Sequence, residues 1–131
     1  LNIGDKVRFM GHISHNSLPR FYRSSHVMLH TALHEAQGVS VTEAMASGVV
    51  VCGTPVGILH DPEKLSLIEK PGQEKRLGER TIELLNNPRE FTKIRRGALA
   101  WALEHDLHWT VEKISGLYSH LITQKTSRGH Q

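Results

Sequence analysis

The stretch that decides the fold is residues 27–52, which read VMLHTALHEAQGVSVTEAMASGVVVC. It begins with a β-type run at 27–30 and ends with the run Val-Val-Val-Cys at 49–52, which is apolar at every position. A strand with two apolar faces is typical of a sheet that helices cover on both sides. Between the two runs, residues 41–46 predict a helix that Gly48 ends at its C′ position. The order strand, helix, strand predicts a right-handed crossover and a parallel sheet.

One further strand is predicted on each side of this unit. Residues 7–10 form a short β-type run, and residues 65–68 form another that precedes Pro71-Gly72. Before the unit, residues 17–23 predict a short helix with a serine N-cap and a proline in its first turn. We therefore expect an α/β fold, with a Rossmann-like parallel sheet of about four strands flanked by helices.

The second half of the chain predicts helices only. Apolar residues recur at helical spacing over 74–86, over 88–104 after an Asn-Pro N-cap signal, and over about 110–122. On the last helix these residues are Val111, Ile114, Leu117, Tyr118 and Leu121. We expect all three apolar stripes to pack into the core. We also expect one domain over residues 1–122 and a flexible polar tail over residues 123–131.

The composition fits one globular domain of 131 residues, of which 38% are hydrophobic. The formal net charge is only +3 and no basic cluster alternates with aromatic residues, so nucleic acid is not an expected partner. Cys52 is the single cysteine and lies in an apolar run, which predicts a buried thiol in a reducing compartment. No apolar run approaches the ~18 residues of a membrane span, so we expect a cytoplasmic protein, and membrane contact by a full-length protein stays open. Because the chain begins at Leu1 rather than Met, we expect a piece of a longer protein.

Residues 34–48 carry the chemistry. Only three acids occur in the first 60 residues, and two of them, Glu35 and Glu43, lie eight positions apart around a glycine turn and a helix start. In a parallel sheet, ligands bind at the loops that follow the carboxyl ends of the strands. The amides of residues 38–40 would form a helix N-terminus, whose positive dipole end suits a diphosphate. Since the two carboxylates can accept hydrogen bonds from sugar hydroxyls, the pattern predicts a site for a phosphorylated sugar.

The same residues also have simpler interpretations. Ser40 and Glu43 have the spacing of a capping box, in which Glu43, in the first turn of the helix, only bonds the Ser40 amide. Glu35 alone could be a solvated loop acid, and Gly38 and Gly48 could serve only the backbone of a turn and a helix end. These alternatives stay open at this point.

Ten histidines raise the question of a metal site. The run His30-x3-His34-Glu35 looks like a ligand cluster, but His30 ends a predicted strand and His34 lies on a loop. The i,i+4 geometry that a helix gives a pair of zinc ligands is therefore missing. We expect no functional metal, and zinc bound here would be adventitious.

The segment from Glu35 to Glu43 resembles the E-x7-E motif of retaining glycosyltransferases of family 4 (group 1), which have the GT-B fold. Neighbouring segments resemble the same family in the same order along the chain. They are residues 7–13, 18–29, 43–51, 71–72 and 84–88, followed by Trp109 and Tyr118. The resemblance covers nearly the whole chain and implies part of the C-terminal, donor-binding domain of such an enzyme.

The resemblance also implies a role for each matching residue of the motif. Glu43 would bind the ribose hydroxyls of the nucleotide. Glu35 would be the catalytic residue, facing the donor sugar near the reacting centre. The backbone of the intervening turn would face the sugar and the phosphates through Gln37, Gly38, Val39 and Ser40.

Two more loops complete the implied site. Ile13, with Ser14 or His15 on the same loop, matches the place where the nucleobase stacks or bonds. Gly57 resembles one glycine of the Gly-Gly-x-x-Glu loop that many members of the family have, and if Asp61 is equivalent to the acid of that loop, the acid is displaced here.

The implied reaction is transfer of a sugar from a nucleotide-sugar to an acceptor, with the anomeric configuration retained and with no metal or other cofactor. The acceptor, a sugar or a lipid-linked molecule, would bind a lobe that is absent from this chain, as is the family's basic pair for the diphosphate. We therefore expect the isolated chain to be inactive, because positioning and water exclusion need that lobe. The alternatives are a GT-B-type nucleotide-sugar epimerase and a non-catalytic binding or interaction module.

Overall fold

The centre of the molecule is a three-stranded parallel sheet. The computed structural model describes residues 2–60 and 66–128, the last three of them by backbone only. The strands lie in the order β1 (Val27–His30), β2 (Val50–Gly53) and β3 (Ser66–Ile68). The register pairs Val27 with Val50, and Val51 with Ser66. The predicted α/β class and the parallel crossover are confirmed.

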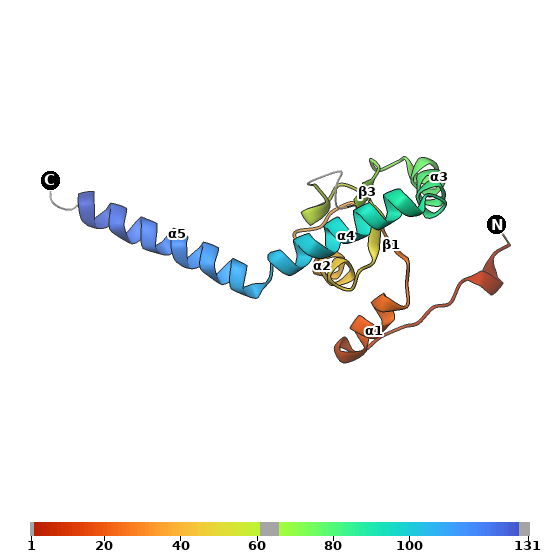
Figure 1. The fold of residues 1–131 in the computed structure, drawn as a ribbon, viewed down its shortest axis with the longest axis horizontal. Helices are drawn as coiled ribbons and strands as arrows, with labels where there is room; N and C mark the ends of the chain where they lie inside the picture. The colour runs from red at the N-terminus through yellow and green to blue at the C-terminus, as the bar shows by residue number, and fades with distance from the viewer. Residues whose placement is uncertain (1, 61–65, 129–131) are drawn as a thin grey trace.

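Helices surround this sheet and continue the chain beyond it (Figure 1). The α-helices are α1 (Leu18–Arg23), α2 (Val39–Ala46), α3 (Glu74–Leu85), α4 (Pro88–Glu104) and α5 (Leu107–Arg128). Short 3-10 turns occupy Gly4–Lys6, His15–Ser17 and Gly57–His60. The elements predicted at 17–23, 27–30, 41–46, 49–52, 74–86 and 88–104 are confirmed to within two residues. The strand predicted at 65–68 is confirmed over Ser66–Ile68, and Leu65 lies outside the described residues.

β2 forms the middle of the core, because all four of its residues are buried. Val51 packs with Met45 of α2 and Ala98 of α4, whereas Cys52 packs on the other side with Leu77 of α3. This alternation confirms a sheet covered on both faces. Burial raises the pKa of the Cys52 thiol, as expected for an inert core cysteine. Truncating a side chain as buried as Met45 to alanine costs about 2–5 kcal/mol of stability.

The predicted strand at residues 7–10 is wrong. These residues are extended, but within the described part of the chain they belong to no strand, and the sheet has three strands instead of about four. Phe9 is 95% exposed, and Val7 and Met10 are also exposed. Figure 1 shows the segment running away from the domain toward the N-terminus. A β-type run becomes a strand only where a neighbouring strand satisfies its backbone groups. Among the described residues no strand pairs with this segment, and the amide of Val7 donates only to the carbonyl of Gly4 in the preceding turn.

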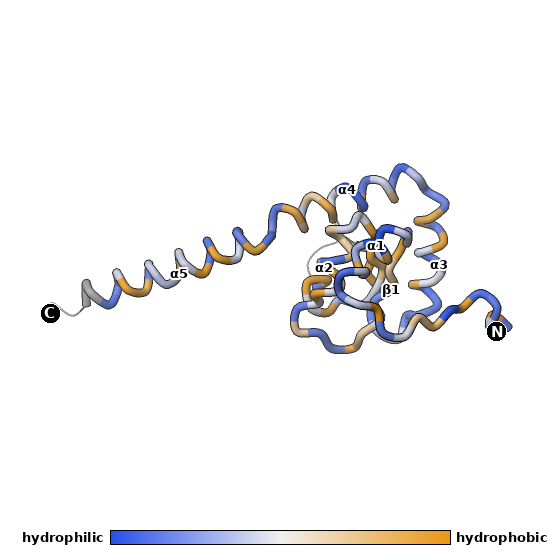
Figure 2. The backbone as a smooth tube through the Cα atoms, turned by 90° about the horizontal axis from the view of Figure 1, so that it is seen from below, coloured by the Kyte–Doolittle hydropathy of each residue, from blue (hydrophilic) through white to orange (hydrophobic). Residues whose placement is uncertain are grey.

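The predicted burial of the last apolar stripe is also wrong. α5 projects from the domain as a single long helix, with hydrophobic and hydrophilic residues alternating along it (Figure 2). Its large apolar residues are exposed, from 39% at Trp109 to 74% at Leu107. α4 ends at Glu104, and the turn at His105 directs α5 away from the sheet. Periodicity therefore identified an apolar face correctly but not whether anything packs against it.

α5 is also longer than expected at its C-terminal end. It includes residues 123–128, which we expected to begin a flexible polar tail, while residues 129–131 lie outside the description. Of the helices described, none combines the length and the apolar character that crossing a membrane requires.

Candidate functional site

The loops that follow β1 and β2 meet at the carboxyl edge of the sheet, beside the start of α2. Gly38 precedes the helix with a φ of +89°, a conformation that favours glycine. Its carbonyl accepts hydrogen bonds from the amides of Val41 and Thr42. Gly38 has no side chain to cap the helix, and within the described residues no acceptor reaches the amides of Val39 and Ser40. The positive end of α2 is therefore open to an anionic ligand.

Glu43 lies in the second turn of α2, because the helix begins at Val39 and not at Val41. Its Oε2 accepts a hydrogen bond of 3.2 Å from the hydroxyl of Tyr22, and its Oε1 lies 3.9 Å from Nδ1 of His15. The capping-box interpretation is wrong, since the N-cap is Gly38 and not Ser40. Burial, and then the nearby Glu43 carboxylate, raise the pKa of Tyr22. The tyrosine is therefore a neutral donor that fixes one oxygen of Glu43.

Glu35 lies on the loop between β1 and α2 and is held more loosely. Its Oε1 accepts a hydrogen bond of 3.0 Å from the amide of Ala36, and its Oε2 lies 4.0 Å from Nε2 of His30. The side chain is 32% exposed, similar to the 29% of Glu43. Both carboxylates are thus half-exposed and flank the first turn of α2.

Gly57 brings the second loop against the first. Its φ is +55°, and a Cβ at this position would lie 2.5 Å from the carbonyl oxygen of Gln37 and 3.0 Å from Cγ of Glu35. The next amide, of Ile58, donates a 2.9 Å hydrogen bond to that same carbonyl of Gln37. Only glycine allows the two loops to approach this closely. The structure therefore brings together three of the predicted site residues, Gln37, Gly57 and Glu35.

Thr54, His30 and Tyr22 support the site and were not among the predicted site residues. The Thr54 hydroxyl donates to the carbonyl of Ala32, and its amide donates to the carbonyl of His30. At the adjacent Gly53, a Cβ would overlap the same His30 carbonyl at 2.1 Å. The Gly-Thr pair that ends β2 therefore holds the loop carrying Glu35. A threonine directly after a buried strand was the available signal.

The two residues predicted for the nucleobase separate in the structure. His15 lies beside Glu43. Ile13 lines a shallow hollow of about 380 Å³ with Met10 and Phe21, and neither glutamate is part of that lining. Asp61 lies outside the described residues, so its role in the second loop stays a prediction.

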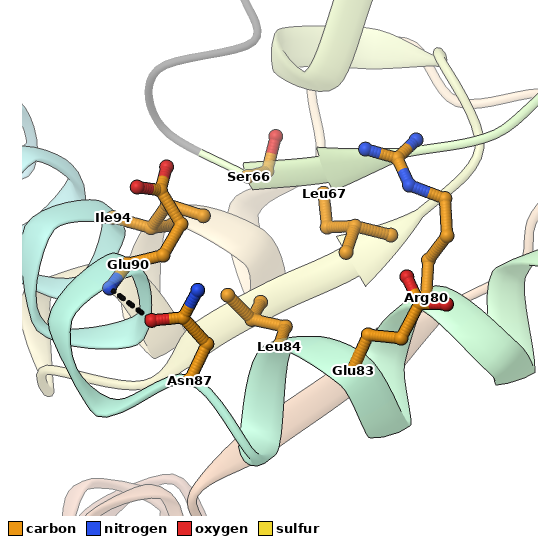
Figure 3. A pocket seen from close by; sticks show the side chains of 8 residues that line it. All are labelled: Ser66, Leu67, Arg80, Glu83, Leu84, Asn87, Glu90 and Ile94. Carbon is orange, nitrogen blue, oxygen red and sulfur yellow. Dashed lines mark hydrogen bonds between the residues drawn. The ribbon is translucent and has the colours of Figure 1, made fainter.

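A second pocket, of about 240 Å³, lies between β3, α3 and α4 (Figure 3). Ser66, the first residue of β3, lines this pocket, so the pocket lies at the amino edge of the sheet, opposite the glutamate site. There Asn87 caps α4, accepting a 3.2 Å hydrogen bond from the amide of Glu90. None of the predicted site residues lines this pocket.

The histidines do not assemble a metal site in the described part of the chain. No three His, Cys, Asp or Glu side chains there are close enough to hold a metal ion together. A function without metal remains a prediction.

The chain is similar to one known protein family. A model of the family described as "Glycosyl transferases group 1" matches residues 1–101. Among curated protein sequences, none matches the chain.

Several solved structures share the fold. Sucrose-phosphate synthase from Thermosynechococcus elongatus is 25% identical with a TM-score of 0.80, over 94% of this chain and 32% of that protein. Anabaena HepE in complex with UDP-glucose is 20% identical with a TM-score of 0.79, over 92% of this chain and 34% of that one. The C-terminal domain of the group 1 protein LpcC from Francisella tularensis is 22% identical with a TM-score of 0.62, over 70% of this chain and 49% of that domain.

The chain thus spans about a third of the length of the first two structures. Its fold is that of GT-B glycosyltransferase C-terminal domains, as the sequence predicted. Because the family model covers residues 1–101 of 131, this chain belongs to the group 1 family of glycosyltransferases.

Proposed function

We propose that this chain is the donor-binding part of a retaining glycosyltransferase, which transfers a sugar from a nucleotide-sugar to an acceptor. The observation that carries the proposal is the open start of α2 between two half-exposed carboxylates, Glu35 and Glu43. A diphosphate suits the helix end, and carboxylates accept hydrogen bonds from sugar hydroxyls. A nucleotide-sugar carries a diphosphate and sugar hydroxyls in one molecule, so it can meet the helix end and the carboxylates together.

Each carboxylate has a different task in this proposal. Tyr22 fixes Glu43, which therefore presents its remaining acceptor capacity to the ribose hydroxyls. Glu35 faces the donor sugar and is the catalytic residue. The backbone of Gln37, Gly38, Val39 and Ser40 meets the sugar and the diphosphate, with Gly57 closing the second loop over them.

The nucleobase would bind near His15, which already contacts Glu43, with Ile13 at the outer end of the same segment. A UDP-sugar is the first donor to test, because HepE was solved with UDP-glucose. No metal takes part in the proposal, since the helix end offsets the charge of the leaving diphosphate.

The acceptor, a sugar or a lipid-linked molecule, would bind elsewhere in a longer protein that works in the cytoplasm. By itself the chain of 131 residues binds donor without turnover, because a glycosyl transfer needs the acceptor held in line with the sugar.

Calorimetric titration of the purified chain with UDP-glucose, GDP-mannose and ADP-glucose tests the proposal. UDP and free glucose serve as ligand controls. We expect one nucleotide-sugar to bind more tightly than its nucleoside diphosphate, because the sugar adds contacts to Glu35. If no nucleotide-sugar binds at millimolar concentration, the donor-binding proposal is wrong.

A further inference from the structure

A buried polar atom beside the site has no hydrogen-bond partner among the residues that the structure describes. His30 ends β1, and its side chain is only 13% exposed. Its Nε2 is buried, and this nitrogen is the atom that lacks a partner. Buried polar atoms in folded proteins are nearly always paired, so an unpaired one needs an explanation. Here the explanation lies in what Nε2 faces.

The position of His30 is fixed by the sheet. It pairs in register with Gly53, whose missing Cβ lets the two backbones approach closely. The His30 carbonyl also accepts the Thr54 amide at 3.0 Å. The backbone that carries the imidazole is therefore held in place. A hydrogen bond to Nε2 then needs a movement of the partner side chain.

The group that can move is the Glu35 carboxylate. Its Oε2 lies 4.0 Å from His30 Nε2, within ion-pair range but beyond hydrogen-bond distance. Its Oε1 is held by the Ala36 amide, on the same loop. A rotation of the Glu35 side chain that moves Oε2 by about 1 Å would bring Oε2 to about 2.8 Å from His30 Nε2, the distance of a charge-assisted hydrogen bond.

We propose that His30 is a positioning residue for Glu35: its Nε2–H donates to Oε2 of Glu35 when the donor sugar is bound. The inference rests on the proposed function and deepens it. Nε2 is too buried to contact the sugar itself, so His30 acts through the carboxylate. Three groups then orient Glu35, since the Ala36 amide and the His30 imidazole each hold one oxygen and the sugar meets the outer lone pairs.

The substitution H30F tests this, because phenylalanine keeps the ring volume and removes the donor. UDP-glucose and UDP are titrated against wild type, H30F and H34F. His34 is the matched control, since it is an exposed histidine one residue before Glu35. We expect H30F to weaken UDP-glucose binding about tenfold and UDP binding less than twofold, with H34F unchanged. H30Q, whose amide can donate from nearly the same place, should recover most of the loss.

The imidazole can also be observed directly in the wild-type protein. In proton–nitrogen NMR spectra, saturation with UDP-glucose should shift the His30 Nε2–H resonance downfield, and saturation with UDP should not. Equal weakening of UDP and UDP-glucose by H30F would show a purely structural role and overturn the inference, as would an unshifted resonance. If wild type binds neither ligand, the proposed function itself fails, which is distinct from a failure confined to H30F.

Discussion

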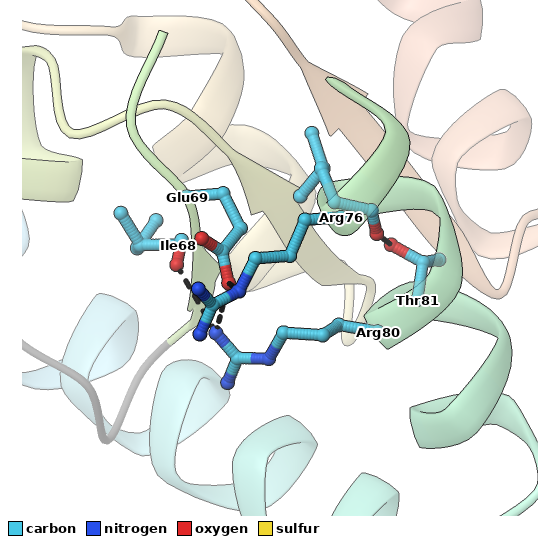
Figure 4. A network of polar contacts seen from close by, with 6 residues as sticks. Ile68, Glu69, Arg76, Arg80 and Thr81 are labelled. Carbon is cyan, nitrogen blue, oxygen red and sulfur yellow. Dashed lines mark hydrogen bonds and ion pairs between the residues drawn. The ribbon is translucent and has the colours of Figure 1, made fainter. Parts of the chain in front are cut away.

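Two acids at the same edge of the sheet have opposite surroundings. Glu69 follows β3 as Glu35 follows β1, yet Glu69 is only 9% exposed. Its Oε1 accepts from the Arg80 guanidinium and lies 3.2 Å from Nε of Arg76 (Figure 4). Glu35 has only the Ala36 amide within hydrogen-bond distance, among the residues described. An acid whose oxygens are paired within the chain, such as Glu69, stabilises the fold, whereas an acid with unused acceptor sites, such as Glu35, can bind a ligand.

The pKa of Glu69 reflects this satisfaction. The hydrogen bond from Arg80 lowers the pKa of its carboxyl below the ordinary value of 4.5, and the charges of Arg76 and Arg80 act in the same direction. Arg80 also donates to the Ile68 carbonyl, so α3 is joined to the end of β3. Neither Glu35 nor Glu43 has such an arginine pair among the described residues, and the nearest basic group of each is a histidine.

The largest effect should come from Glu43. E43A removes the acceptor that we propose for the ribose, so UDP-glucose affinity should fall about 100-fold, with thermal stability nearly unchanged. Calorimetry measures the affinity, and E112A, an exposed glutamate on α5, is the control. Wild-type affinity in E43A would place the ribose elsewhere.

Glu69 should show the reverse pattern. E69Q should lower the free energy of unfolding at neutral pH and leave UDP-glucose affinity within twofold. Since the folded pKa is lowered, the stabilisation is present above pH 4.5 and is lost as the pH falls through the folded pKa. Urea unfolding of both proteins from pH 3 to 8 should therefore show a difference that shrinks in acid. A difference independent of pH would contradict the ion-pair explanation.

Gly57 joins the two loops of the site and should affect both properties. In G57A, the new Cβ collides with the Gln37 carbonyl, and the φ of +55° is unfavourable for alanine. We expect about 1–2 kcal/mol less stability and about tenfold weaker UDP-glucose binding. G116A is the control, because nothing lies within 4 Å of a Cβ there. Tight binding by G57A would show that the second loop does not contribute.

A smaller effect is expected from Tyr22. Y22F removes the donor to Glu43 and should weaken UDP-glucose binding about threefold, because the carboxylate keeps its place on α2 but loses orientation. The pKa of Tyr22 is raised, so in wild type the free energy of unfolding falls as the pH rises above 10, where the unfolded state ionises first. Urea unfolding from pH 8 to 11 should show this additional fall in wild type only. The same fall in Y22F would assign it to another group.

Removing metal should have no effect. UDP-glucose affinity with EDTA and with added magnesium or manganese should agree within twofold, because we assign the neutralisation of the diphosphate to the start of α2. A tenfold gain on adding either metal would overturn that assignment.

The sequence predicted the local elements well, because strands, caps and glycine turns are encoded by neighbouring residues. Asn87 caps α4 and Gly48 follows α2 with a positive φ, as their positions predicted. The run at Phe9 was predicted to be a strand and the apolar stripe of α5 to be part of the core, and both are exposed. Their pattern reports an apolar face, but its burial depends on a neighbour that no local pattern encodes.

The positions of the two site glutamates could be predicted from the sequence, but their contacts could not. The spacing of Glu35 and Glu43 placed both beside the start of α2, but the helix begins two residues earlier than expected, at Val39, which removed the capping box. The partners of these acids, Tyr22 and His30, lie on other elements and meet them only through the packing of α1 and β1 against α2. Sequence spacing cannot give such contacts.

In the proposed function, the donor binds at the carboxyl edge of the sheet, between Glu35 and Glu43. The most direct test follows the backbone amides by NMR during titration with UDP-glucose. We expect the largest shifts over residues 37–40 and at Gly57, with little change in the pocket of Ser66 and Asn87. Shifts concentrated in that opposite pocket would contradict it.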